Sequence, residues 1–131
     1  MKQYTSEILI MNGKAATGIE AYYQVDDYQH VMFTLSSTNS GNFTIKFQWS
    51  MSDTPPDFAA AQTNSNRWDY VQVKDYEDNA AIDGDTGVAF AWTDDVRQFE
   101  MNTNGMKWVC ARITAYSAGN VYVRVKGFNN Q

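Results

Sequence analysis

The stretch WVCARITAYSAGNVYVRVK, residues 108–126, alternates apolar and polar residues almost throughout. Successive side chains of a β-strand leave on opposite faces, so this period of two predicts strands with one buried face. The intervening residues 117–120 include Gly119 and Asn120, which tolerate a positive φ. The stretch therefore predicts two long strands joined by a tight hairpin. The predicted inward-facing residues are Val109, Ala111, Ile113, Ala115, Val121, Val123 and Val125.

Similar alternation recurs along the rest of the chain, at residues 18–25, 31–35, 42–51, 68–74, 88–92 and 96–101. Clusters of Gly, Asn and Asp separate these segments, including a polar loop at residues 36–41, and an irregular segment with two prolines covers residues 52–67. About eight or nine short strands without an amphipathic helix predict an all-β fold. We expect an antiparallel β-sandwich, jelly-roll-like, forming a single domain over residues 1–131.

The composition and charge of the chain argue against nucleic acids and membranes as binding partners. The chain has 131 residues, of which 44% are hydrophobic and 15% aromatic, and its formal net charge is -5. An acidic chain whose lysines and arginines are scattered lacks the basic patch that nucleic-acid binding needs. No apolar run is long enough for a membrane span, and the first ten residues are too polar for a signal peptide. We expect synthesis in a cytoplasm, with neither nucleic acid nor membrane as partner.

The sequence offers little for catalysis. His30 is the only histidine and Cys110 the only cysteine, and both lie within predicted strands. A nucleophilic thiolate needs an electropositive, partly open setting, which a strand interior rarely provides. Nothing singles out two of the fifteen acidic residues as a glycosidase pair. We therefore predict a protein that is not an enzyme and has no catalytic residues.

The segment Asp83-Gly84-Asp85-Thr86-Gly87 is the strongest candidate for a metal site. Two carboxylates two residues apart, with glycines that allow sharp turning, suit hard cations such as Ca²⁺. The segment lacks the ligand spacing of an EF-hand, so a solvated turn is the alternative. Apart from Ca²⁺ at Asp83 and Asp85, no cofactor is expected.

Aromatic and basic residues on the polar side of residues 108–128 give the best argument for binding. If this side is exposed, it forms an apolar surface of the kind that contacts a partner. Alternatively, a second sheet or residues 52–67 cover this side. A third interpretation is that its aromatic rings stack on sugar rings. The candidate interface consists of Trp108, Arg112, Tyr116, Tyr122, Arg124 and Phe128.

Three stretches carry a resemblance to a known group of proteins. They are residues 104–123, residues 44–53, and residues 68–73 together with 82–87. Their strand-and-turn pattern resembles small all-β structural proteins of tailed bacteriophages, such as capsid decoration and head-fibre-like β-sandwiches. The group implies no catalytic residues for this chain.

The resemblance implies a virion structural protein. We expect a capsid decoration (cement) protein that contacts the major capsid protein or other virion subunits and self-associates, as a trimer by analogy. A carbohydrate-binding module, or an accessory protein of a tail fibre or baseplate, is the alternative. An exposed Trp68 or Trp92 would favour sugar binding.

Overall fold

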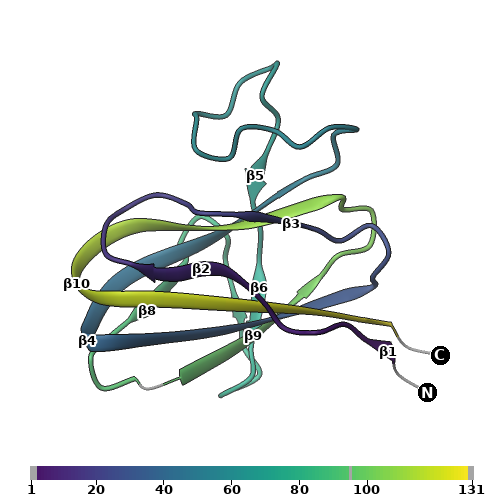
Figure 1. The fold of residues 1–131 in the computed structure, drawn as a ribbon. Helices are drawn as coiled ribbons and strands as arrows, with labels where there is room; N and C mark the ends of the chain where they lie inside the picture. Colours follow the sequence, from purple (N-terminus) through teal and green to yellow (C-terminus); the bar gives the residue numbers. More distant parts are fainter. Residues whose placement is uncertain (1–2, 95, 130–131) are drawn as a thin grey trace.

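Two long strands, β4 (His30–Ser50) and β10 (Trp108–Asn129), form the framework of the protein. The computed structural model describes residues 3–94 and 96–129. The two strands pair antiparallel along their length, from Trp108 opposite Ser50 to Phe128 opposite His30. Both strands bend at the same place, so their halves form two facing layers (Figure 1). Layer one contains residues 30–38 and 120–129, and layer two contains residues 42–50 and 108–118.

The shorter strands extend these two layers by antiparallel pairing. In layer one, β1 (Gln3–Tyr4) and β2 (Ile8–Lys14) pair with β10, and β9 (Val96–Asn102), β6 (Val73–Asp75) and β7 (Ala81–Ile82) follow β4. In layer two, β3 (Tyr22–Gln24) pairs with β10, whereas β5 (Asp69–Tyr70) and β8 (Val88–Phe90) pair with β4. The described residues thus form one ten-stranded sheet that is folded onto itself. Within them, no helix is long and apolar enough to cross a membrane.

The bend replaces the hairpin that the sequence predicts. Residues 108–116 and 121–126 do not pair with each other, because both pair with β4. Gly119, at a φ of 99°, lies in a bulge of β10 that bends the strand without reversing it. The predicted loop at residues 36–41 is likewise part of β4, with Asn39 and Ser40 at positive φ. Asn39 Nδ2 donates to Asn120 Oδ1 at 2.6 Å, which ties the two bends together.

The core lies between the two layers. Phe33 in layer one contacts Phe47 in layer two, with ring centroids 4.5 Å apart. Full burial of such side chains stabilises a fold by about 1.5–3 kcal/mol each. Most of the predicted inward-facing residues are buried, whereas Ala115 is exposed because the pairing of β10 with β4 is irregular between Ile113 and Ala115. The all-β antiparallel prediction is confirmed. The two layers are halves of one sheet, which differs from the separate sheets of a jelly roll.

An ion pair closes the edge of the sandwich at β6 and β9. The Arg97 guanidinium binds the buried carboxylate of Asp75, and its Nη1 also donates to Ala89 O of β8 at 3.1 Å. One side chain therefore joins β9 to its neighbour β6 in layer one and to β8 in layer two.

The outer side of layer two is covered by residues 52–68, which we call the cap. The cap leaves β4 and projects beyond the body of the sandwich before the chain enters β5 (Figure 1). Its Phe58 and Trp68 form a second apolar cluster with Trp108 and Cys110. Gln48 is fully buried beneath it and donates from Nε2 to Phe58 O at 2.9 Å. Residues 57–60 of the cap form a hydrogen-bonded turn, in which Ala60 N donates to Asp57 O.

Candidate functional site

The bend of β10 separates the six residues of the predicted interface. Trp108 and Arg112 lie on the outer side of layer two, beneath the cap. Trp108 is 9% exposed and its Nε1 donates to Ser52 O at 2.8 Å, while Arg112 Nη1 donates to Phe58 O at 3.2 Å. For this pair the covered interpretation is correct, because the cap supplies their partners.

The other four residues lie at the bend or in layer one. The half-buried Tyr116 packs against the core, and its hydroxyl donates to Gly119 O at 2.8 Å. Phe128 is 6% exposed and stacks on His30, with centroids 5.0 Å apart. Tyr122 and Arg124 remain half-buried on the outer side of layer one. The six residues therefore do not share one surface, and an interface role for Tyr122 and Arg124 stays a prediction.

Tyr122 and Arg124 belong to a broader surface that we call the outer sheet face. Cross-strand pairing brings Arg124 beside Thr34 and Thr34 beside Gln98, and a shallow hollow of about 210 Å³ lies over these residues. The residues of this face alternate along each strand with residues that point into the core, so they form the opposite side of the same strands. Both apolar and polar side chains lie on it. Its members are Met32, Thr34, Val96, Gln98, Tyr122, Arg124 and Lys126.

Cys110 and His30, which could act as nucleophile and base, lie in separate surroundings. Cys110 is fully buried, and burial raises the pKa of its thiol from 9.0 to about 12. Its Sγ donates to Ala21 O at 3.3 Å, so the thiol is a packed, protonated group. The Nδ1 atom of His30 lies 2.9 Å from Glu100 Oε2 on the outer side of layer one. No Cys–His pair forms.

The Asp83–Asp85 segment is an exposed turn stabilised by its own backbone. Asp83 Oδ1 accepts from Asp85 N at 2.8 Å and from Thr86 N at 3.4 Å. Among the residues that the structure describes, no three His, Cys, Asp or Glu side chains come together in a way that suits a metal ion. The calcium site stays a prediction, and the observed bonds are those of a capped turn.

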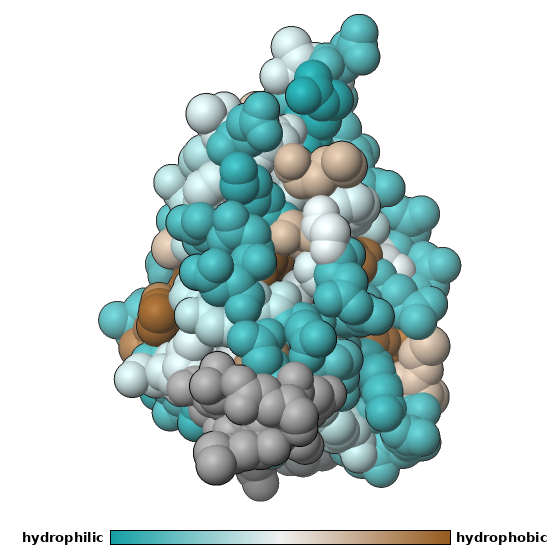
Figure 2. All heavy atoms as spheres, turned by 90° about the vertical axis from the view of Figure 1, so that its right-hand side faces the viewer, coloured by the Kyte–Doolittle hydropathy of each residue, from teal (hydrophilic) through white to brown (hydrophobic). Residues whose placement is uncertain are grey.

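Two clefts meet at the end of the sandwich where the β3–β4 and β9–β10 connections lie, and Asn104 lines both. This end faces the viewer in Figure 2 and is dominated by hydrophilic residues. The first, the end cleft, has a volume of about 390 Å³. The second, the His30 cleft, has a volume of about 560 Å³. The His30 cleft is lined by His30, Val71, Gln72, Val73, Lys74, Glu100, Asn102 and Asn104.

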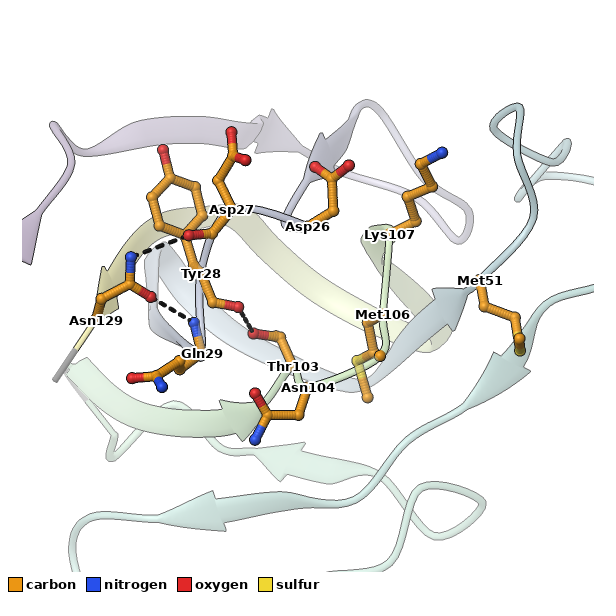
Figure 3. Close-up of a pocket in the computed structure, with 11 residues that line it drawn as sticks. Asp26, Asp27, Tyr28, Gln29, Met51, Thr103, Asn104, Met106, Lys107 and Asn129 are labelled. Carbon is orange, nitrogen blue, oxygen red and sulfur yellow. Dashed lines mark hydrogen bonds between the residues drawn. The ribbon is translucent and has the colours of Figure 1, made fainter.

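In the end cleft, the side chains of Asn129 and Thr103 bind the backbone of the β3–β4 connection (Figure 3). Asn129 Nδ2 donates to Asp27 O at 3.0 Å, and Asn129 Oδ1 accepts from Gln29 N at 2.8 Å. The buried Thr103 Oγ1 donates to Tyr28 O at 2.8 Å. Desolvation, and then the adjacent Tyr23, raises the pKa of Tyr28, so its phenol is neutral at physiological pH. These bonds fasten the β3–β4 connection to its neighbours, which is a structural role.

The His30 cleft is different, because its polar side chains surround an open volume. β4 supplies His30, β9 supplies Glu100 and Asn102, and β6 supplies Lys74. The pairing of Lys74 with Glu100 and of His30 with Asn102 brings these residues to one region of the sheet. Sequence reasoning did not find this cleft, because only strand pairing brings residues 30, 74 and 100 together.

Comparisons of the fold give clear matches, whereas comparisons of the sequence give none. Neither a search of protein families nor a search of curated proteins yields a match. The fold is similar to that of the SPBc2 prophage-derived protein YomS, with a TM-score of 0.70 and 10% identity, over 98% of this chain and 95% of that one. It is also similar to the PBSX exported protein XepA, with a TM-score of 0.71 and 11% identity.

The match to XepA covers 97% of this chain and 38% of XepA, so the chain spans less than half of that protein. At these identities the likeness shows a shared fold. Both comparisons extend over nearly the whole chain, so the folded sheet with its bent strands is an architecture found in other proteins.

Proposed function

We propose that the protein is a non-catalytic structural component of a phage particle that binds other virion subunits. The observation that carries this proposal is the fold shared with the SPBc2 prophage-derived protein YomS over 98% of the chain. The strand-and-turn pattern that resembles small all-β structural proteins of tailed phages supports the same class. The thiol of Cys110 is buried and protonated, which is poorly suited to a nucleophile.

Within that class, the proposal assigns a capsid decoration role. The protein would contact neighbouring major capsid subunits and add buried interface across their boundary, which resists separation of the subunits. A stable contact needs about 800 Å² on each partner. The outer sheet face is suited to this role, because it is a broad surface that includes an aromatic ring and an arginine, those of Tyr122 and Arg124. Self-association as a trimer is part of the proposal.

Particle binding by surface variants tests this assignment. The variant Tyr122→Ser/Arg124→Ser should lose cosedimentation with particles that lack the protein, while its circular dichroism spectrum and melting temperature stay close to wild type. The matched control is Tyr22→Ser, which removes a 48% exposed tyrosine from layer two. Unchanged particle binding by the double variant would remove the outer sheet face from the proposal. Light scattering of the purified chain tests the trimer.

The alternative is an accessory or carbohydrate-binding role in a tail fibre or baseplate. One observation favours it: Trp92 is 69% exposed, as that role predicts, whereas Trp68 is 7% exposed and is buried in the apolar cluster of the cap. Asp94 Oδ2 accepts from Ala91 N at 2.9 Å and Asp94 N donates to Ala91 O, so Trp92 lies on a well-defined turn. A shift in tryptophan fluorescence on addition of a glycan, lost in Trp92→Ala, would support this alternative.

A further inference from the structure

The His30 cleft has a balanced charge. Of its described lining residues, Lys74 and Glu100 carry formal charges, and these two oppose each other across the β6–β9 pair. A highly charged ligand would therefore meet no excess of the opposite charge in this cleft. The cleft is suited to a neutral ligand that is recognised by hydrogen bonds.

A hydrogen bond holds the central carboxylate of the cleft. Glu100 Oε1 accepts from the hydroxyl of Tyr76 at 2.7 Å, and Glu100 Oε2 lies 2.9 Å from Nδ1 of His30. The His30 ring in turn stacks on Phe128 with an interplanar angle of 17°. The bond from Tyr76 orients Glu100 before any ligand arrives, which lowers the entropic cost of binding.

Side-chain amides line the cleft, and one aromatic ring lies next to its lining. Gln72, Asn102 and Asn104 are exposed lining residues, and each amide group offers both donors and acceptors. Asn102 Oδ1 accepts from Asn104 N at 3.1 Å, which orients the Asn102 amide. Tyr76 adjoins the lining residues Glu100 and Lys74: its hydroxyl donates to Glu100, Lys74 Nζ lies 5.9 Å from its ring centroid, and the residue is 42% exposed. Amides that donate and accept, beside an aromatic ring, match a sugar with hydroxyl groups on its rim and C–H groups on its face.

We propose that the His30 cleft is a binding site for a neutral oligosaccharide. Gln72 and Asn104 hydrogen-bond its hydroxyl groups, and the ring of Tyr76 packs against a sugar face. The volume of about 560 Å³ lies within the range of small-ligand sites and accommodates a short saccharide. This site is separate from the exposed Trp92, and the proposal does not depend on a capsid role.

A peptide is a poorer match for the cleft. A peptide that adds to a sheet needs an unpaired strand edge. At the floor of the cleft, β9 pairs with both β4 and β6, and β6 pairs with both β9 and β7. Where Lys74 pairs with Glu100, the backbone groups of β6 and β9 have partners, so recognition at this part of the cleft depends on side chains.

A glycan array of neutral oligosaccharides built from hexoses and N-acetylhexosamines, probed with the purified full chain, tests the proposal. We expect binding to a subset of these glycans. For a glycan that binds, calorimetry should show that Tyr76→Ala, Gln72→Ala and Asn104→Ala each weaken binding about tenfold, the effect of losing one good contact. The matched controls Asn64→Ala, on the cap, and Trp92→Ala should bind like wild type.

Three results would overturn the proposal. The first is an absence of binding across the neutral array. The second is glycan binding that Trp92→Ala abolishes and Tyr76→Ala leaves unchanged, which would assign the sugar to the other end of the molecule. The third is binding confined to sulfated or carboxylated glycans and lost at high salt, which would indicate charge recognition by Lys74. None of these results bears on particle binding by the Tyr122→Ser/Arg124→Ser variant, so the two proposals fail independently.

Discussion

Replacing Arg97 by methionine removes the guanidinium that joins β9 to β6 and β8 and keeps most of the apolar stem. In the native protein the side chains of Arg97 and Asp75 are 16% and 5% exposed. Asp75 Oδ1 also accepts from Glu77 N at 2.9 Å, so the carboxylate cannot simply turn toward water. The substitution therefore leaves a buried carboxylate without its cation, and Ala89 O loses the donor that Arg97 Nη1 supplied.

Removing one partner of such a buried pair destabilises a protein by about 3–5 kcal/mol. With an unfolding entropy of roughly 2.1 cal/mol/K per residue, 131 residues give a shift of roughly 4 °C in the melting temperature for each kcal/mol. Arg97→Met should thus melt roughly 11–18 °C below wild type in calorimetry. Its midpoint in urea should fall as well, with an unchanged slope if the denatured state is unaffected.

Two controls separate burial from charge. Glu100→Gln removes a carboxylate on the outer side of the same strand, where Glu100 and the adjacent His30 are 21% and 23% exposed, and should cost about 1 kcal/mol or less. Arg97→Met/Asp75→Asn should be less destabilised than the sum of its single variants, because the double variant leaves no buried charge, whereas each single variant leaves one without its partner. A loss below about 1 kcal/mol in Arg97→Met would refute the reasoning, since that is the value of a surface ion pair.

Three further predictions concern the bend, the thiol and the cap. Gly119 has a φ of 99°, and a Cβ added there would lie 2.5 Å from the backbone of β4, so Gly119→Ala should lower the free energy of unfolding in urea by about 2–4 kcal/mol. Gly105 has a φ of 83° with nothing within 4 Å of an added Cβ, so Gly105→Ala should lower it by about 1 kcal/mol. Burial raises the pKa of Cys110 from 9.0 to about 12, so above pH 9 the thiol ionises in the unfolded chain but not in the folded protein. The free energy of unfolding should therefore be unaffected by this group below pH 9 and fall by about 1.4 kcal/mol per pH unit above it, and Cys110→Ala should lack this fall. Phe58→Ala should cost about 3–5 kcal/mol and shift tryptophan fluorescence to the red as Trp108 becomes wet; an unshifted spectrum would mean that the cap does not shield it.

Period-two patterns predicted which residues face the core, because strand geometry fixes that property locally. Phe33, Phe47 and Val123 are buried as the alternation requires. The same patterns could not predict the path of the chain. A glycine at positive φ serves a hairpin turn and a bulge equally well, and the choice depends on which strand supplies the hydrogen-bond partners. For residues flanking Gly119, that partner is β4, tens of residues away in sequence.

Because the hairpin prediction was wrong, the predicted interface was also wrong in placing its residues on one surface. With a hairpin, Trp108 and Tyr122 would lie on one surface, whereas the bend places them on opposite layers. The alternation at residues 42–51 places Gln48 on the side of β4 that faces away from the core, yet Gln48 is fully buried, because the cap lies over it. The apolar Phe58 within an irregular, proline-containing segment was the available signal that residues 52–67 pack against the sheet.

The folded sheet also accounts for where binding surfaces remain. Folding one sheet onto itself buries one side of each half in a common core and leaves two outer sides. The cap occupies the outer side of layer two and gives Trp108 and Arg112 their partners. The outer side of layer one keeps its side chains exposed or half-buried, and the His30 cleft lies at one end of that layer. The ion pair of Arg97 and Asp75 holds β6 against β9, and β6 carries Lys74 into the cleft. Arg97→Met should therefore loosen the cleft as well as the fold, and glycan binding should weaken in that variant even at temperatures where it remains folded.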